Sequence, residues 1–133
     1  MIKSLIFSCL FFFFTLISNA QQILPGANQI TQYLPLIKGK QVAIFANQTS
    51  MVGDIHLVDF LLSKGISVKL IFGPEHGFRG TADAGEKVKS GKDARTNITV
   101  ISLYGAHKKP TKEDLKGIDV LMYDIQDVGV RFY

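Results

Sequence analysis

Two short apolar runs, separated by a segment of helical periodicity, constrain the fold of this chain more than any other feature. Val42–Ala46 and Val68–Phe72 are continuous apolar runs bounded by polar residues, a pattern typical of strands buried on both faces. A strand, a helix and a second strand in this order form a parallel, right-handed βαβ unit. The apolar residues at helical spacing between the two runs are Ile55, Val58, Leu61 and Leu62.

The limits of this helix and the remaining elements follow from local signals. Asp54 is the expected N-cap and Gly65 the expected stop. Thr99–Leu103 and Val120–Tyr123 are two further strand candidates, and a second helix is expected to start with Thr111 as its N-cap. Alternating strands and helices predict an α/β fold with a largely parallel sheet and flanking helices.

Other stretches give no sustained pattern. Gln21–Tyr33 is polar with scattered apolar residues, and residues 81–97 are rich in Gly, Lys and Asp, which we interpret as a long loop. The chain ends at Tyr133 without a closing helix. Because an open parallel sheet leaves an uncovered edge, we expect an incomplete domain that folds poorly and is inactive on its own.

The amino-terminal segment predicts export. Lys3 opens a short positive region, Leu5–Ile17 is mostly apolar, and small residues precede a cleavage point expected after Ala20. The apolar run spans only about 20 Å as a helix, short of the ~30 Å hydrocarbon core of a membrane. We therefore expect residues 1–20 to be a signal peptide, and residues 21–133 to be secreted, into a periplasm, without a stable membrane anchor.

Composition excludes several classes of protein. The net charge is only +4, and the lysines are dispersed and not interleaved with aromatic residues, so a nucleic-acid partner is not expected. The single cysteine, Cys9, lies in the predicted signal peptide. The exported chain would then have no disulfide and would depend on packing, which implies a substantial hydrophobic core.

Polar residues follow three of the four predicted strands. In an open parallel sheet, ligands bind beyond the carboxyl ends of the strands, and these ends meet at one rim. The residues expected there are Asn47, Gln48 and Thr49 after the first strand, Glu75, His76 and Arg79 after the second, and Asp124, Gln126, Asp127 and Arg131 after the fourth.

Glu75 is the strongest candidate for chemistry. Pro74 and flanking glycines favour a sharp, stiff turn that could hold a carboxyl group as a general acid or base. Cleavage of a sugar bond usually needs such an acid and a second group, for which Asp124 or Asp127 is available. The alternative is that Glu75 merely pairs with Arg79 or caps a turn.

Metal and cofactor chemistry find little support. His76 could orient Glu75, bind substrate or ligate a metal, but His56 and Asp59 fall on the expected helix, on its solvated face, and no HExxH spacing occurs. We expect no metal site. No GxSxG elbow, GxGxxG or P-loop is present, so neither a serine nucleophile nor a nucleotide is expected. Four charges of the long loop are interpreted as solvated: Asp83, Glu86, Asp93 and Arg95.

Four motifs resemble those of the DUF1343 family, whose characterised members are NamZ-type exo-β-N-acetylmuramidases. These enzymes remove N-acetylmuramic acid from the non-reducing end of peptidoglycan fragments. The resemblance extends over residues 37–133 and implies the amino-terminal part of a Rossmann-like catalytic domain, followed in the family by a smaller domain, with the active site between them. The motifs are Val42–Ser50, Phe72–Gly80, Ser102–Gly105 and Asp124–Tyr133.

The resemblance also implies roles for individual residues. Glu75 matches the proposed catalytic glutamate, and a guanidinium of Arg79 or Arg131 suits the lactyl carboxylate of N-acetylmuramic acid. The implied partner is a peptidoglycan-derived sugar, and no cofactor is expected. A non-catalytic binding protein for wall fragments and a metal-dependent hydrolase remain alternatives. We assign Glu75, His76 and Asp124 to catalysis, and Asn47, Arg79, Gln126, Asp127 and Arg131 to substrate binding.

Overall fold

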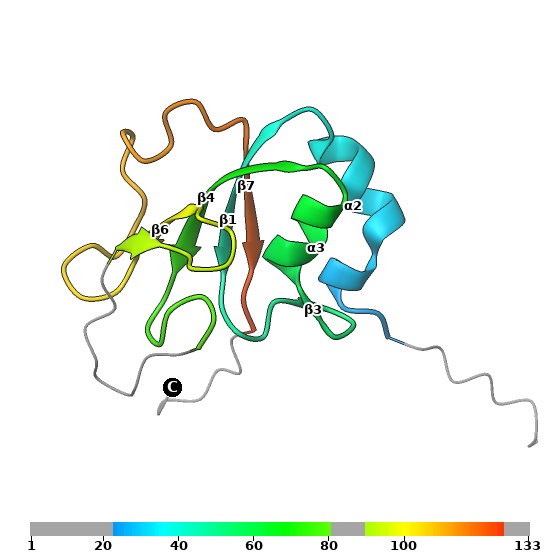
Figure 1. The fold of residues 1–133 in the computed structure, drawn as a ribbon, viewed down its shortest axis with the longest axis horizontal. Helices are drawn as coiled ribbons and strands as arrows, with labels where there is room; N and C mark the ends of the chain where they lie inside the picture. The colour runs from blue at the N-terminus through cyan, green and yellow to red at the C-terminus, as the bar shows by residue number, and fades with distance from the viewer. Residues whose placement is uncertain (1–22, 81–89, 127–133) are drawn as a thin grey trace, which may run out of the picture.

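A sheet with two short helices on one face is the central feature of the computed structural model, which describes residues 23–80 and 90–126 (Figure 1). The elements in chain order are η1 (Gly26–Asn28), α2 (Ile30–Ile37), β1 (Gln41–Ala46), β2 (Met51–Val52), β3 (Ile55–His56), α3 (Leu57–Ser63), β4 (Ser67–Gly73), β5 (Gly91–Lys92), β6 (Thr99–Ser102) and β7 (Val120–Asp124).

The main sheet has five strands in the order β5-β6-β4-β1-β7. β1 pairs in parallel with both β4 and β7, β4 pairs in parallel with β6, and the short β5 is antiparallel to β6. The prediction of a largely parallel α/β sheet is confirmed, and the order is consistent with a Rossmann-like fold. From β1 the chain moves outward through β4 to β6 and then returns to the other side of β1, so the direction of winding reverses between β1 and β7.

One face of the sheet carries most of the core. α2 and α3 lie on the same side of the sheet in Figure 1, and their apolar residues pack with those of β1 and β4. The predicted helical spacing is confirmed at Val58 and Leu61, which are fully buried. Ile55 is exposed because it lies in β3, before the helix begins.

The opposite face has a thinner cover. Ala43, Leu70 and Phe72 form its buried cluster, against which Leu115 and Ile118 pack from the connection between β6 and β7. Within residues 103–119 the structure forms turns and no helix, so the helix predicted to start at Thr111 is wrong.

The N-cap signal at Thr111 is nevertheless real. The Thr111 backbone N donates to Asp114 Oδ2 at 2.8 Å, and the Asp114 N donates to Thr111 Oγ1 at 3.1 Å. Gly117 then takes a φ of 76°, a left-handed conformation that prevents the turns from continuing as a helix. Only five residues, 112–116, lie between this cap and Gly117, too few for the hydrogen bonds of a helix to offset the cost of starting it.

The start of α3 also differs from expectation. Gly53 and Asp54 form the turn of a small hairpin between β2 and β3, and His56 caps the helix by accepting a hydrogen bond from the Val58 N to Nδ1 at 3.3 Å. The predicted stop is confirmed, because Gly65 takes a φ of 73° and its N donates to the Leu62 O at 2.9 Å.

Two elements were missed by the sequence analysis. The segment Gln21–Tyr33, in which no pattern was found, contains η1 and the start of α2. α2 forms although Pro35 lies inside it. Residues 91–92 form β5, within the stretch interpreted as a loop. Among the described residues no helix is long and apolar enough to cross a membrane, and the predicted signal peptide lies outside them.

Candidate functional site

The carboxyl ends of β1, β4 and β7 lie at one level of the sheet. Phe45 pairs with Phe72 across β1 and β4, and Ala46 pairs with Asp124 across β1 and β7. Asn47 therefore leaves its strand between the loop that carries Glu75 and the end of β7. This rim is where the polar residues of the sequence were expected.

Asn47 holds the loop after β1 and is fully buried. Its Oδ1 accepts hydrogen bonds from the Thr49 N at 2.9 Å and from Thr49 Oγ1 at 2.6 Å, and its N donates to Ser50 Oγ at 3.1 Å. With its Oδ1 occupied and no exposed surface, Asn47 shapes the rim. Its buried Nδ2 has no hydrogen-bond partner among the described residues, and its role in substrate binding stays a prediction.

The same loop is tied to the end of β7. Ser50 Oγ donates to the Asp124 O, and the Gln126 N donates to Thr49 Oγ1 at 3.3 Å. Asp124 and Gln126 are thereby fixed beside the end of β1, as the strand order requires.

Asp124 has an unusual environment. Its Oδ2 is buried without a hydrogen-bond partner among the described residues. Burial raises the pKa of the Asp124 carboxyl, although the neighbouring His56 and the Ser50 hydroxyl oppose that shift. A carboxyl of this kind keeps its proton to higher pH than an exposed one, which suits it to proton transfer.

A cavity of about 530 Å³ lies at the end of β1 and β7, where the winding of the sheet reverses. Its volume falls within the ~300–1,000 Å³ typical of ligand pockets. It is lined by Pro25, Ala27, Asn28, Thr49, Met51, Gly53, Asp124, Ile125 and Gln126.

The loop carrying Glu75 turns back tightly on the end of β4. A Cβ on Gly73 would lie 3.0 Å from the Phe78 backbone N, so a side chain at position 73 would require the loop backbone to shift. The Gly77 N donates to the Pro74 O at 3.0 Å, and His76 takes a φ of 67°, which costs a non-glycine residue on the order of 1–3 kcal/mol. The stiff turn predicted around Glu75 is present, and strain is stored beside the candidate acid.

Glu75 is half-buried and faces Tyr104, which follows β6. A hydrogen bond to Glu75 and the negative charge of that carboxylate raise the pKa of the Tyr104 hydroxyl. Tyr104 was not among the predicted site residues. Its position just beyond a predicted strand was the signal that could have identified it.

Arg79 does not pair with Glu75, so that part of the alternative is wrong. The guanidinium binds Asp59 through Nη1 and Nη2, both at 3.0 Å, and binds Asp93 through Nε at 2.9 Å and Nη2 at 2.8 Å. These bonds raise the pKa of Arg79 and lower those of both carboxyls. Four hydrogen bonds hold Arg79 to two carboxylates, so its guanidinium is not available to bind a substrate carboxylate. This differs from the role predicted for Arg79 in substrate binding.

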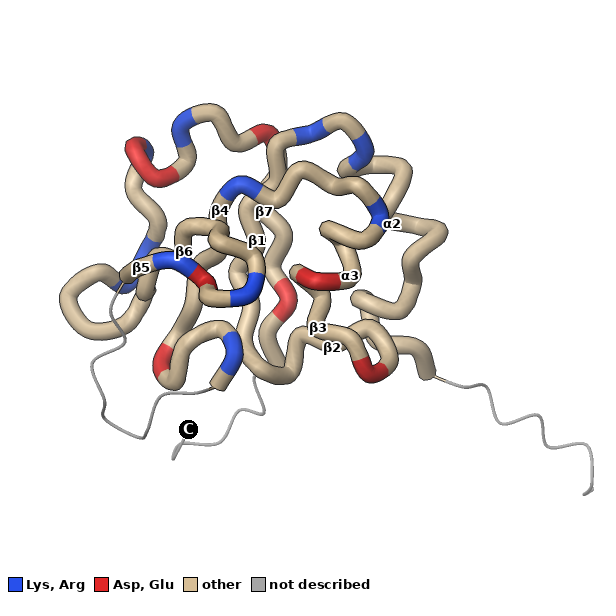
Figure 2. The backbone as a smooth tube through the Cα atoms, in the orientation of Figure 1, with Lys and Arg blue, Asp and Glu red and all other residues tan. Residues whose placement is uncertain are grey.

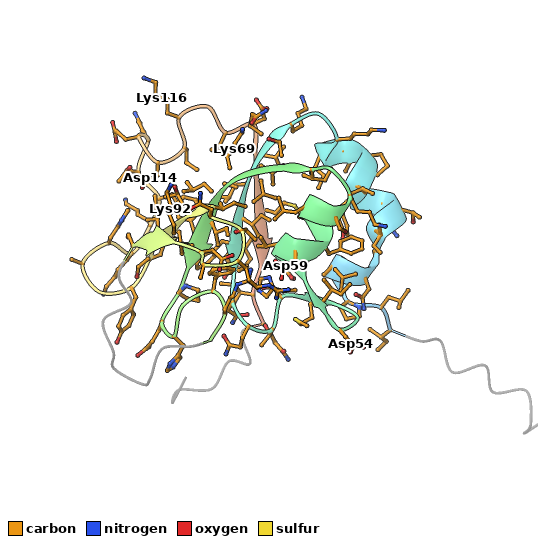
Figure 3. All side chains as sticks on the ribbon, viewed as in Figure 1. Asp54, Asp59, Lys69, Lys92, Asp114 and Lys116 are labelled. Carbon is orange, nitrogen blue, oxygen red and sulfur yellow. The ribbon has the colours of Figure 1, made fainter. Side chains whose placement is uncertain are left out.

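Two interpretations of charged residues are corrected by the same contacts. Asp59, labelled in Figure 3, was placed on a solvated helix face but is bound by Arg79 and Arg95. Asp93 was interpreted as a solvated loop charge, yet its side chain is only 5% exposed. Arg95 pairs with Asp59 at 3.1 Å but remains 71% exposed.

His56 is also buried, contrary to the prediction. Its Nε2 lies 3.0 Å from the Asn47 O and 3.3 Å from the Phe78 O. Because both partners are carbonyls, Nε2 donates, and Nδ1 accepts from the Val58 N. His56 therefore joins the loop after β1 to the loop after β4.

The described chain has neither a large patch of one charge nor a cluster of metal ligands (Figure 2). Lys and Arg are interspersed with Asp and Glu along the described chain (Figure 2). Within residues 23–80 and 90–126, no group of three or more His, Cys, Asp or Glu side chains could hold a metal ion. Four residues considered above lie outside the described residues: Asp83, Glu86, Asp127 and Arg131.

Comparisons with known proteins agree with this architecture. The chain is 44% identical over 106 residues to the peptidoglycan beta-N-acetylmuramidase NamZ of Bacillus subtilis (strain 168), covering 78% of this chain and 26% of that protein. Two crystal structures of DUF1343 family proteins from Bacteroides fragilis NCTC 9343 superpose with TM-scores of 0.65 and 0.64, at 44% and 40% identity.

These structural matches cover 81% and 76% of this chain but 27% and 25% of the two Bacteroides chains. The chain thus spans about a quarter of the length of its relatives. Residues 42–133 match the family described as "Exo-beta-N-acetylmuramidase NamZ, N-terminal". The strand order, the rim and these matches together show that the chain belongs to the NamZ family and corresponds to its amino-terminal part.

Proposed function

We propose that the protein containing this chain is a glycoside hydrolase that removes N-acetylmuramic acid from the non-reducing end of peptidoglycan fragments. The name of the Bacillus subtilis relative supports the reaction class. The observation that carries the proposal is Glu75, a half-buried carboxyl held on a strained turn at the ligand-binding end of a parallel sheet.

Glu75 serves as the general acid and base. Hydrolysis of a sugar bond requires a proton on the departing oxygen, and a carboxyl at a fixed position delivers it with little reorganisation. Tyr104, which follows β6, contacts Glu75 and can orient its carboxyl group. His76 follows Glu75 directly, in a left-handed conformation, and we assign it a supporting role in placing that carboxyl.

Asp124 is the second group. It lies across β1 from the Glu75 loop, at the wall of the cavity, and its pKa is raised by burial. A carboxyl there can stabilise positive charge at the anomeric carbon or activate water, depending on its protonation. The separation of the two carboxyl groups with substrate bound would decide between retention and inversion of configuration.

Substrate binding is assigned to the cavity beside β7. Gln126 and Thr49 line this cavity with hydrogen-bonding groups. Because Arg79 is held by two carboxylates, Arg131 becomes the candidate for the lactyl carboxylate of the sugar. The assignment of Asp127 to substrate binding stays a prediction. Peptidoglycan lies outside the cytoplasm, so the proposed substrate accords with an exported, periplasmic protein.

The test is hydrolysis of a nitrophenyl N-acetylmuramide by the protein expressed from the complete reading frame that contains this sequence. Glu75→Gln is expected to lower kcat by roughly 100-fold or more, since general acid–base catalysis contributes ~10²–10⁴-fold. Glu113→Gln, at an exposed turn, is the matched control and should leave kcat unchanged. Sugar binding without turnover, or full activity of Glu75→Gln, would contradict the proposal.

A further inference from the structure

The structure brings three separate segments together around one guanidinium. Arg79 is in the loop that carries Glu75, Asp59 is on α3, and Asp93 follows β5. The two carboxylates accept four hydrogen bonds from Arg79, all between 2.8 and 3.0 Å. We call this group of three residues the Arg79 clamp.

Both carboxylates of the clamp are held in place by the fold. Asp93 Oδ2 also accepts hydrogen bonds from the Thr96 N at 3.0 Å and from Thr96 Oγ1 at 2.7 Å. The Asp93 backbone is fixed by a bond from its N to the Ile98 O at 2.9 Å. Asp59 is in the first turn of α3. Arg79 therefore binds to two rigid supports.

The clamp fixes one end of the Glu75 loop, and β4 fixes the other. Gly73 belongs to the sheet, and its O accepts from the Leu103 N at 2.8 Å. At the far end, Phe78 is buried, its O is held by His56, and its ring lies 4.7 Å from the Arg79 guanidinium carbon. Glu75 lies on the short tip between these two anchors.

Charge balance separates the clamp from substrate recognition. Arg95 also pairs with Asp59, so the clamp together with Arg95 carries two positive and two negative charges. A guanidinium already shared by two carboxylates offers little attraction to a third. An arginine that binds a substrate carboxylate should instead keep a pair of guanidinium N–H donors free.

We propose that Arg79 is a positioning residue, which sets the location of the Glu75 carboxyl through the Arg79 clamp and does not bind substrate. The inference rests on the proposed role of Glu75. Lysine at position 79 would keep the charge but lose the planar fork that binds both carboxylates at once. The loop would then remain near its place but lose its fixed geometry.

The first arm of the test is kinetic and uses the protein from the complete reading frame. Arg79→Lys should lower kcat by roughly 10- to 100-fold, because a misplacement of about 1 Å can cost that much, with KM changed less than about twofold. Arg95→Gln is the matched control, since Arg95 shares Asp59 but is exposed and outside the loop. It should leave both constants unchanged. A rise in KM that exceeds the fall in kcat would show substrate binding by Arg79 and overturn the proposal.

The second arm is hydrogen exchange, which needs no activity. In Arg79→Lys the amides of Gly77 and Gly80, which bond to the Pro74 O and the Gly77 O, should exchange at least about tenfold faster. Amides within β1 and β4 should keep their wild-type rates. Unchanged hydrogen exchange in the loop of Arg79→Lys would overturn the positioning role, whatever the activity of the wild-type protein. Faster exchange in the variant, together with no muramidase activity in the wild-type protein, would count against the proposed function alone.

Discussion

The two sides of β1 differ in how firmly their functional residues are held. On the β4 side, the Glu75 loop is anchored by the sheet, by His56 and by the Arg79 clamp. On the β7 side, the loop after β1 supplies two hydrogen bonds, and the neighbouring space is a cavity. A rigid carboxyl suits proton transfer, while an open wall suits a ligand that must enter and leave.

The strands below these two sites show the same contrast. Phe72 in β4 is fully buried, whereas β7 is an edge of the described sheet with alternating partial exposure. Tyr123 is 68% exposed, and among the described residues its ring packs with one aromatic ring, that of Phe45, at 5.0 Å between centroids. That this polypeptide folds poorly on its own stays a prediction, and the exposed β7 edge is its physical basis.

The largest expected effect comes from breaking the packed side. Phe72→Ala should lower the free energy of unfolding by about 3–5 kcal/mol, because it removes a fully buried ring and leaves a cavity. Tyr123→Ala, its counterpart at the edge, should cost less than about 1 kcal/mol in the same denaturant titration. Equal losses would mean that β7 is buried in the protein from the complete reading frame, and the contrast between the two sides would then be wrong.

A smaller effect is expected where the Glu75 loop meets the loop after β1. A Cβ on Gly80 would lie 2.9 Å from the Gln48 Cβ, and Gly80 also takes a φ of 66°. Gly80→Ala should therefore destabilise the protein by roughly 2–3 kcal/mol.

Gly105→Ala is the matched control for this substitution. Gly105 has a φ of 83°, but the space around its missing Cβ is open. The substitution should cost only the strain of the conformation, about 1 kcal/mol. If both alanine variants melt at the same temperature, the two loops do not press against each other.

The sequence predicted the elements that depend on local patterns. The runs Val42–Ala46 and Val68–Phe72 became β1 and β4 because a continuous apolar run must be covered on both faces. Gly65 ended α3 because few other residues accept its conformation. The polar residues that follow β1, β4 and β7 lie at one rim, as predicted, because the carboxyl ends of parallel strands meet at the same edge of a sheet.

What the sequence could not predict depends on partners distant along the chain. Asp93 resembled a solvated charge in a glycine-rich stretch until the fold brought Arg79 to within 2.8 Å. Asp54 resembled an N-cap because the same residue type also favours the turn it occupies. His56 has no sequence signal for its role, which exists only because two carbonyls from separate loops converge on it.

The stability contributions of the carboxyl groups on the two sides of β1 should change with pH in opposite directions. The folded state depresses the pKa values of Asp59 and Asp93, so their contribution to stability is full above the unfolded values of about 4 and is lost as pH falls through the folded values. Asp124 has a raised pKa, so the folded state holds its proton more tightly, and stability decreases as pH rises through that folded value.

Substitution of the two carboxyls separates these contributions. Asp93→Asn should flatten the loss of melting temperature below about pH 4, and its penalty near neutral pH should be roughly 1–3 kcal/mol. Asp124→Asn should instead raise the melting temperature at neutral pH. Thermal unfolding across pH 2–8 measures both, and a lower melting temperature for Asp124→Asn at pH 7 would contradict the assigned environment.

The smallest expected effect concerns Tyr104 and the acid it contacts. Tyr104 is 38% exposed and its hydroxyl bonds to Glu75, so Tyr104→Phe should leave the melting temperature unchanged. It removes one hydrogen bond from a carboxyl whose position is already set by the two anchors of its loop. We therefore expect kcat to fall by only about three- to tenfold, with an altered pH dependence of kcat/KM. A fall in kcat as large as that of Glu75→Gln would mean that Tyr104 takes part in the chemical step itself. Catalysis on the β4 side of β1 would then depend on two side chains, Glu75 and Tyr104, and not on Glu75 alone.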